Sequence, residues 1–249
     1  MKPAARMLTV LLLLPLALFA SVPAWAETDV ILDDDPFWED EEFADEFIGS
    51  AGSGGGPSLT WFTQDLDALN GVLRDEGLKA VPEKELYWGG AGWAGVYSGN
   101  DLYVAIGGGG FGGSQDARSG DLYSRWSLGA GYFAVKAIYP VLRRVYAEGG
   151  VQLGGGHSDI WVEDVADGDP DQGLVLVHLR ADRNFVLLRP HLGVDLRLSD
   201  WIGLLVEGGY TLTSGDWELE GREVLLQQLE GKMPDGDGPY VSVMVRFGI

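Results

Sequence analysis

Apolar and polar residues alternate one by one through most of the chain beyond residue 86. From Leu188 to Leu198 every second residue is aliphatic or proline, and the residues between them are polar or glycine. Successive side chains of a β-strand point to opposite faces, so this pattern predicts strands with one apolar and one polar face. Since an apolar face must be covered by protein or lipid, the chain is expected to form one antiparallel barrel or sandwich.

The same alternation, together with turn signals between the segments, predicts about eight strands. They are expected at residues 85–98, 102–112, 122–136, 145–153, 173–180, 188–199, 202–213 and 240–249. Loops are expected at 113–121, 158–172 and 214–239. The last of these contains residues 218–232, which fit a short amphipathic helix with Val224, Leu225 and Leu229 on its apolar side.

The first 26 residues have the pattern of a cleaved secretory signal peptide. Lys2 and Arg6 precede an apolar run over residues 7–20, and Ala24-Trp25-Ala26 supplies the small-x-small cleavage pattern. The run is shorter than the roughly 20 residues that a spanning helix needs. We therefore expect an exported protein whose later segments can enter a membrane only as strands.

Between the signal peptide and the strands, two further segments are expected. Residues 27–57 form an acidic disordered arm and a Gly/Ser linker, because residues 27–50 hold eleven acids and no Lys or Arg. Aromatic residues among these acids suggest docking on an envelope protein partner, although a solvated linker is the simpler interpretation. Residues 58–85 are expected to hold a short helix over Thr63–Gly77, capped by Thr63, and residues 86–249 to form the barrel.

Composition narrows the class of protein. The chain has no cysteine and a formal net charge of −21, so disulfides do not stabilise it and nucleic acid is not an expected partner.

An apolar strand face has two explanations. In a soluble barrel it points inward, and Leu188, Leu192, Val194 and Leu196 would then line a site for a small apolar ligand. In an outer-membrane barrel it faces lipid, and the polar face lines the interior. Many glycines share the polar face with charged residues, which favours the second explanation, because a narrow interior admits only small or mutually paired side chains. The expected interior network is Glu148, Arg189, His191, Asp195, Arg197, Glu207 and Arg246.

The final strand, YVSVMVRFGI, alternates and carries the aromatic Phe247 two residues before the end. With the pattern of residues 86–249, it resembles the small Gram-negative outer-membrane β-barrels of the outer-membrane protein A and W type. The resemblance implies an all-β fold, a single antiparallel barrel of about eight strands with its apolar band against outer-membrane lipid. It implies no particular activity. In this strand count the acidic stretch at 158–172 falls on the periplasmic side, where turns are normally short.

We therefore expect a non-enzymatic outer-membrane protein that is structural, adhesive or a narrow solute passage. A soluble periplasmic or secreted barrel that binds an apolar ligand is the alternative, and a lipid-modifying outer-membrane enzyme comes third.

Candidate catalytic and metal sites are few. His157, Ser158 and Asp159 are the residue types of nucleophilic hydrolysis, but adjacent strand residues face opposite ways, so an ordinary strand end is expected. Asp167, Asp169 and Asp171 alternate as in a calcium loop, but Gln172 and His178 stand where that loop needs Gly and Glu. A solvated acidic loop is expected there, and neither a cofactor nor a catalytic metal is predicted.

Overall fold

The computed structural model describes residues 53–81, 84–99, 102–142, 144–165 and 175–248. The predicted signal peptide, nearly all of the acidic arm with its linker, and Asp167, Asp169 and Asp171 lie outside the described residues. The elements are β1 (Gly54–Thr63), α3 (Asp67–Asp75), β2 (Lys84–Gly99), β3 (Leu102–Ser119), β4 (Leu122–Leu142), β5 (Val145–Val165), β6 (Val175–Arg197), β7 (Ile202–Ser214), β8 (Trp217–Gly221), α4 (Glu223–Leu229) and β9 (Gly238–Phe247).

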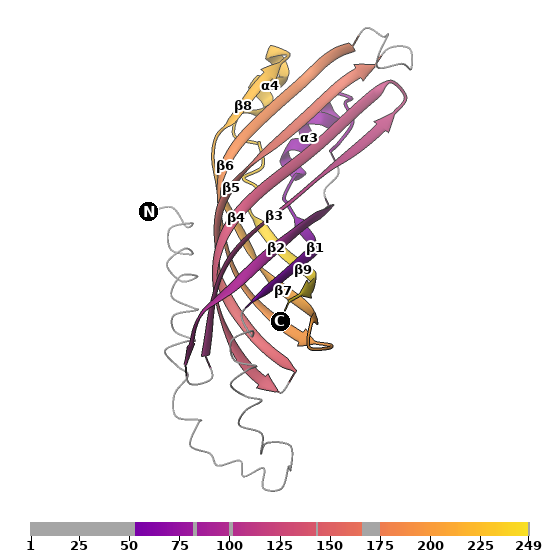
Figure 1. Cartoon of the computed structure of the whole chain (residues 1–249). Coiled ribbons are helices and arrows are strands. Elements are labelled where there is room, and N and C mark those ends of the chain that lie inside the picture. The colour runs from indigo at the N-terminus through magenta and orange to yellow at the C-terminus, as the bar shows by residue number, and fades with distance from the viewer. Residues whose placement is uncertain (1–52, 82–83, 100–101, 143, 166–174, 249) are drawn as a thin grey trace, which may run out of the picture. The chain divides into compact units, whose positions relative to one another are not determined.

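Eight of the strands close into a ring in which every pairing is antiparallel. The order around the ring is β1-β2-β3-β4-β5-β6-β7-β9, and β9 returns to pair with β1. The ninth strand, β8, pairs only with the outer part of β6. The structure thus confirms the predicted all-β fold, a single eight-stranded barrel with a short helix near its start (Figure 1).

Two of the predicted strand assignments were wrong in compensating ways. Residues 54–63, assigned from sequence to the linker and helical segment, form β1 and close the barrel between β2 and β9. The two strands predicted at 173–180 and 188–199 are parts of the single strand β6, which the structure describes as Val175–Arg197. The barrel therefore begins at Gly54 rather than at residue 86.

The two ends of the barrel differ in how its strands are connected. At one end, β2–β3, β4–β5 and β6–β7 follow each other closely in sequence, and the backbone N–H of Gly248 donates to the carbonyl of Trp201 at 3.2 Å. At the other end, α3 lies between β1 and β2, and β8 and α4 lie between β7 and β9. β5 ends and β6 begins at this second end, so the connection between them is not on the short-turn side, and residues 158–165 of the predicted loop belong to β5.

Strand length is uneven around the ring. β4, β5 and β6 have 21, 21 and 23 residues, whereas β1 and β9 have 10 each. The outer parts of β3–β6 therefore continue past the closed ring as a sheet, with α3 and α4 beside it (Figure 1). We call this sheet the extension (residues 113–128, 157–165 and 175–185) and the remainder of the strands the barrel section.

Two helices cover one face of the extension. Leu69 and Leu73 of α3 and Leu225 and Leu229 of α4 are buried in one apolar cluster with residues of β4, β5 and β6. Val224, predicted on the apolar side of its helix, is instead exposed.

The α3 segment begins and ends differently from the prediction. Thr63 ends β1 and caps nothing; Asp65 Oδ1 instead accepts from the N–H of Asp67 at 3.1 Å. After the helix, the Asn70 side chain exchanges two hydrogen bonds with the backbone of Val81, at 2.9 and 2.8 Å, which fixes the path of the returning chain.

Within the described ranges no helix combines the length and apolar character required to cross a bilayer.

Candidate functional site

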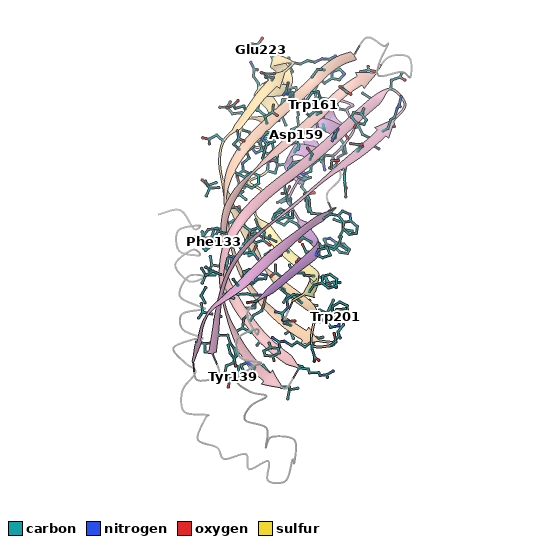
Figure 2. The ribbon with its side chains drawn as sticks, in the orientation of Figure 1. Phe133, Tyr139, Asp159, Trp161, Trp201 and Glu223 are labelled. Atoms are coloured by element: carbon teal, nitrogen blue, oxygen red, sulfur yellow. The ribbon has the colours of Figure 1, made fainter. Side chains whose placement is uncertain are left out.

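Outward-facing side chains change character part of the way along the long strands. On β6 the outward Val186, Leu192 and Val194 of the barrel section are 65, 59 and 43 % exposed, whereas the outward residues of the extension include Arg180 and Asp182. β5 changes in the same way: Leu153 faces out in the barrel section, and His157, Asp159 and Trp161 face out in the extension. Figure 2 shows Phe133 on the barrel section and Asp159 and Trp161 on the extension.

Inward-facing side chains change in the opposite sense. On β6 the inward residues of the barrel section nearest the short turns are Arg189, His191, Asp195 and Arg197, all buried. Further out the buried inward residues are Leu187, Phe185, Ala181 and Leu179, with Arg183 the one charged residue among these. On β5, Glu148 and Gln152 give way to Ile160 and Val162. The barrel section thus carries buried charges inside, beside a smaller apolar cluster around Trp93 and Ile138, and an apolar surface outside. The extension has the ordinary arrangement of a water-soluble domain, with a mainly apolar inner face.

This arrangement contradicts the soluble alternative for the barrel section. Leu192 and Val194, which that alternative places inside around a ligand, are on the outer surface. Arg189 and Arg197, which it places in water, are 1 and 7 % exposed.

The structure places all seven residues of the expected network inside the barrel section, together with two further charged or amide residues that the expected network left out, Lys136 and Gln152. Lys136 Nζ contacts Glu148 Oε2 at 2.7 Å, and Arg246 Nη1 contacts Asp195 Oδ2 at 2.6 Å. Lys136 and Gln152 occupy inward positions of their strands, so their alternation register was the signal that could have identified them.

Gln152 and several aromatic rings complete this interior. The Gln152 amide nitrogen donates to Glu207 Oε1, and the Gln152 amide oxygen accepts from Arg189 Nη1, both at 3.2 Å. The Arg189 guanidinium lies 3.5 Å from the ring centre of Tyr240 and 4.5 Å from that of Phe111. Side chains therefore fill the barrel section, as the narrow interior of an eight-stranded barrel favours.

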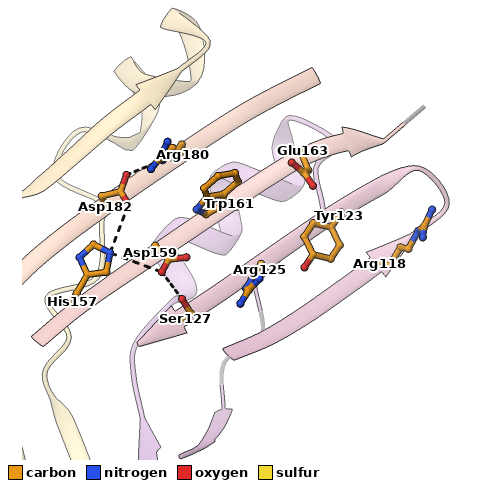
Figure 3. Close-up of a pocket in the computed structure, with 10 residues that line it drawn as sticks. All are labelled: Arg118, Tyr123, Arg125, Ser127, His157, Asp159, Trp161, Glu163, Arg180 and Asp182. Carbon is orange, nitrogen blue, oxygen red and sulfur yellow. Dashed lines mark hydrogen bonds and ion pairs between the residues drawn. The ribbon is translucent and has the colours of Figure 1, made fainter. Parts of the chain in front are cut away.

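A groove of about 620 Å³ lies on the outer face of the extension (Figure 3). Arginines, acids and two aromatic residues from β3, β4, β5 and β6 line it. Arg180 contacts Asp182 at 3.0 Å and lies 4.8 Å from the ring centre of Trp161. At the edge of this groove, burial and a hydrogen bond with Asp116 raise the pKa of the Tyr123 phenol.

The three adjacent residues His157, Ser158 and Asp159 do not assemble into a catalytic group. Ser158 is buried and faces inward, away from His157. The hydroxyl beside Asp159 is that of Ser127, which donates to the Asp159 carboxylate rather than to an imidazole. His157 contacts Asn184 at 3.2 Å through Nδ1, and its Nε2 lies 3.8 Å from Asp182 and 4.0 Å from Asp159 (Figure 3).

Arg183 fixes the connection between β7 and β9. Its guanidinium donates to the carbonyls of Gly215 at 3.1 Å and Asp235 at 2.5 Å, and to the Thr213 hydroxyl at 3.0 Å. Burial lowers the pKa of Arg183 and raises the pKa of the nearby Asp237 carboxyl, which accepts from the Thr213 N–H. The chain that carries α4 is therefore anchored to the extension at its return.

No protein-family model matches the chain, and no curated protein sequence matches it. Solved structures with a similar fold include CarO of Acinetobacter baumannii, 13 % identical with a TM-score of 0.42, covering 80 % of this chain and 98 % of that one. Ail, the attachment invasion locus protein of Yersinia pestis, is 11 % identical with a TM-score of 0.39, covering 80 and 99 %. The outer membrane protease OmpT of Escherichia coli is 10 % identical with a TM-score of 0.38, covering 80 and 96 %. Such a remote likeness transfers no activity to this chain.

Proposed function

We propose that the protein is a closed β-barrel of the bacterial outer membrane that acts without catalysis, as a structural or adhesive component of the envelope. The barrel section lies in lipid, and the extension with its two helices stands in water outside the cell. The single observation that supports this is the reversal of polarity along β5 and β6. The outer face is apolar in the barrel section and polar in the extension, and the inner face changes in the opposite sense.

The height of the apolar surface fits a bilayer. On β6 the outward apolar residues run from Val186 to Leu198. At about 3.3 Å per residue and a tilt of roughly 40°, these twelve steps rise roughly 30 Å, which is close to the thickness of the hydrocarbon layer. Above Val186, outward charged residues such as Asp182 and Arg180 suit water and lipid head groups.

The direction of insertion follows from the connections. Outer-membrane barrels have short periplasmic turns and longer extracellular connections. The end that carries α3 and α4 is therefore the extracellular end, and the described part of the chain both begins and ends at the periplasmic side.

A solute passage is the less favoured function. The ion pair of Lys136 with Glu148, the pair of Arg246 with Asp195, and Arg189 between two aromatic rings all occupy the space that a pore would need. Towards the extracellular end, the cluster that contains Leu69, Leu73 and Leu229 lies beneath the helices.

One experiment tests both the location and the closed interior. The chain is expressed with its leader in a Gram-negative host, outer membranes are isolated, and boiled and unboiled samples are compared on a denaturing gel. We expect recovery in the membrane, a heat-dependent mobility shift, and no steady conductance when the purified barrel is placed in a planar bilayer. Recovery as soluble periplasmic protein would overturn the membrane assignment, and a stable open-channel current would favour the passage instead.

A further inference from the structure

We infer that the interior of the barrel section holds a site for one divalent transition-metal ion, with Glu148, His191 and Glu207 as its ligands. Each residue offers one ligand atom, and the three atoms lie within 4.8 Å of one another. The residues come from three neighbouring strands, β5, β6 and β7, and all three are at least nine-tenths buried. The inference rests on the fold of the barrel section and does not require the proposed function.

Unsatisfied polar atoms point to a missing ligand. In the described part of the chain, no side chain hydrogen-bonds the His191 ring, which is close enough to hydrogen-bond at most the backbone of Arg189, and Glu148 Oε1 has no partner. A buried polar group without a partner costs about 1–3 kcal/mol. Other buried atoms of the described interior, such as Asp195 Oδ1, also lack a partner, but those of Glu148 and His191 converge with a second carboxylate, that of Glu207. One ion in contact with both residues would satisfy His191 through a single nitrogen together with the free oxygen of Glu148.

Neighbouring residues orient the two carboxylates and leave carboxylate oxygens open for an ion. Lys136 contacts Glu148 through Oε2, which leaves Oε1 open. Gln152 donates to Glu207 Oε1 and so orients that side chain. Such second contacts are typical of metal ligands, because they fix the ligand orientation before the ion arrives.

A glycine gives the two carboxylates room to converge. Gly193 of β6 pairs with Glu148 on one side and with Glu207 on the other. A Cβ at this position would lie 3.2 Å from a carbon of each glutamate side chain. A larger residue there would press on both glutamate side chains, whereas glycine leaves this space open.

The ligand set indicates the class of ion. One imidazole and two carboxylates suit Zn²⁺ and related first-row dications. Zinc lies about 2.0–2.2 Å from such ligands, so tetrahedral ligands stand roughly 3.4 Å apart, and binding would draw these side chains together by ~1 Å. Because side chains fill the interior on both sides of the site, we expect the ion to enter while the barrel folds.

The test uses the full mature chain refolded in detergent with Zn²⁺. Excess metal, including zinc on exposed carboxylates, is removed with a chelator, and the zinc that remains is measured by atomic emission. We expect about one ion per barrel in the wild type. We expect almost none in His191→Gln or Glu207→Gln, each assayed only where the heat-dependent gel shift shows a folded barrel.

A matched control separates this site from adventitious binding. His178 is also a buried histidine of β6, but it lies in the extension, and His178→Gln should retain the same zinc as the wild type. Refolding with Co²⁺ should give a visible absorption band that His191→Gln abolishes. Absence of chelator-resistant zinc in the wild type, or equal zinc in the wild type and both ligand variants, would overturn the inference.

Discussion

At the scale of single residues, buried charges have different partners in the two parts of the molecule. In the barrel section they contact each other, as Lys136 contacts Glu148 and Arg246 contacts Asp195. In the extension, Arg183 is buried on a mainly apolar face and is satisfied largely by backbone carbonyls. A buried guanidinium with such partners holds a chain segment in place, because its charge-assisted hydrogen bonds to several carbonyls are stronger than neutral ones.

Replacing Arg183 by Ala should release the β7–β9 connection. The carbonyls of Gly215 and Asp235 would lose a charged donor, at a cost on the order of 2–3 kcal/mol. We expect limited proteolysis of folded protein to cut within residues 215–237 faster in the variant, while the heat-dependent gel shift of the barrel persists. Arg180→Ala is the control, because that side chain is 45 % exposed and should leave the rate of cutting unchanged. Equal cutting in all three proteins would show that Arg183 does not anchor the connection.

At the scale of the secondary-structure elements, the outer face of each long strand is apolar in one part and polar in the other. Each face of β6 is apolar in one part and polar in the other, with the change between Asn184 and Val186 on the outer face. A strand face has the polarity of the environment that it contacts, so in the proposed outer-membrane location this change marks the level at which the strand leaves the hydrocarbon. The same element would then be a membrane strand at one end and part of a water-exposed sheet at the other.

Two lysine substitutions on the outer face of β6 should separate these environments. Leu192→Lys puts a charge into the lipid-facing surface, where it costs about 2–4 kcal/mol near the midplane. Asn184→Lys puts the same side chain, also exposed, above the apolar surface. We expect the fraction folded into lipid vesicles at equilibrium in urea to fall for the first and to match the wild type for the second. Equal effects of both would contradict the proposed membrane level.

At the scale of the whole molecule, two cores of opposite construction share four strands. The barrel section is closed by its own ring of hydrogen bonds, and β1 pairs with β2 up to Thr63 and Lys84. The extension, by contrast, depends on α3 and α4 to cover its apolar face. The barrel section should therefore fold without the helices, whereas the extension should not keep a water-soluble surface without them.

Replacing residues 64–83 by a two-residue Asn-Gly turn tests this division, since Thr63 and Lys84 already face each other across the hairpin. We expect the heat-dependent shift to persist and the extension to bind a hydrophobic fluorescent dye, because the apolar cluster loses Leu69 and Leu73. Gly71→Ala is the matched control: a Cβ there meets no atom within 4 Å, and the change should stabilise α3 by roughly 1 kcal/mol. If the deletion abolished the shift, the barrel section would depend on α3.

The amino-acid sequence by itself determined the class of fold and the sidedness of the barrel wall. Alternation with glycines on the polar face is a local property, and it was enough to predict an antiparallel barrel, seven of its eight ring strands in whole or in part, and the seven charged or histidine residues that the structure places inside. It did not reveal β1, because residues 54–57 are three glycines and a proline, which give no alternation.

Only the tertiary structure decided where the strands end and which interior residues meet. The alternation of β5 and β6 changes phase where the surrounding solvent changes, so each long strand looked like a short strand followed by a loop or a second strand. Glu148, His191 and Glu207 are separated by up to 59 positions and converge only because β5, β6 and β7 are neighbours in register. Periodicity reports the environment of a single strand, whereas a site made from three strands requires their pairing.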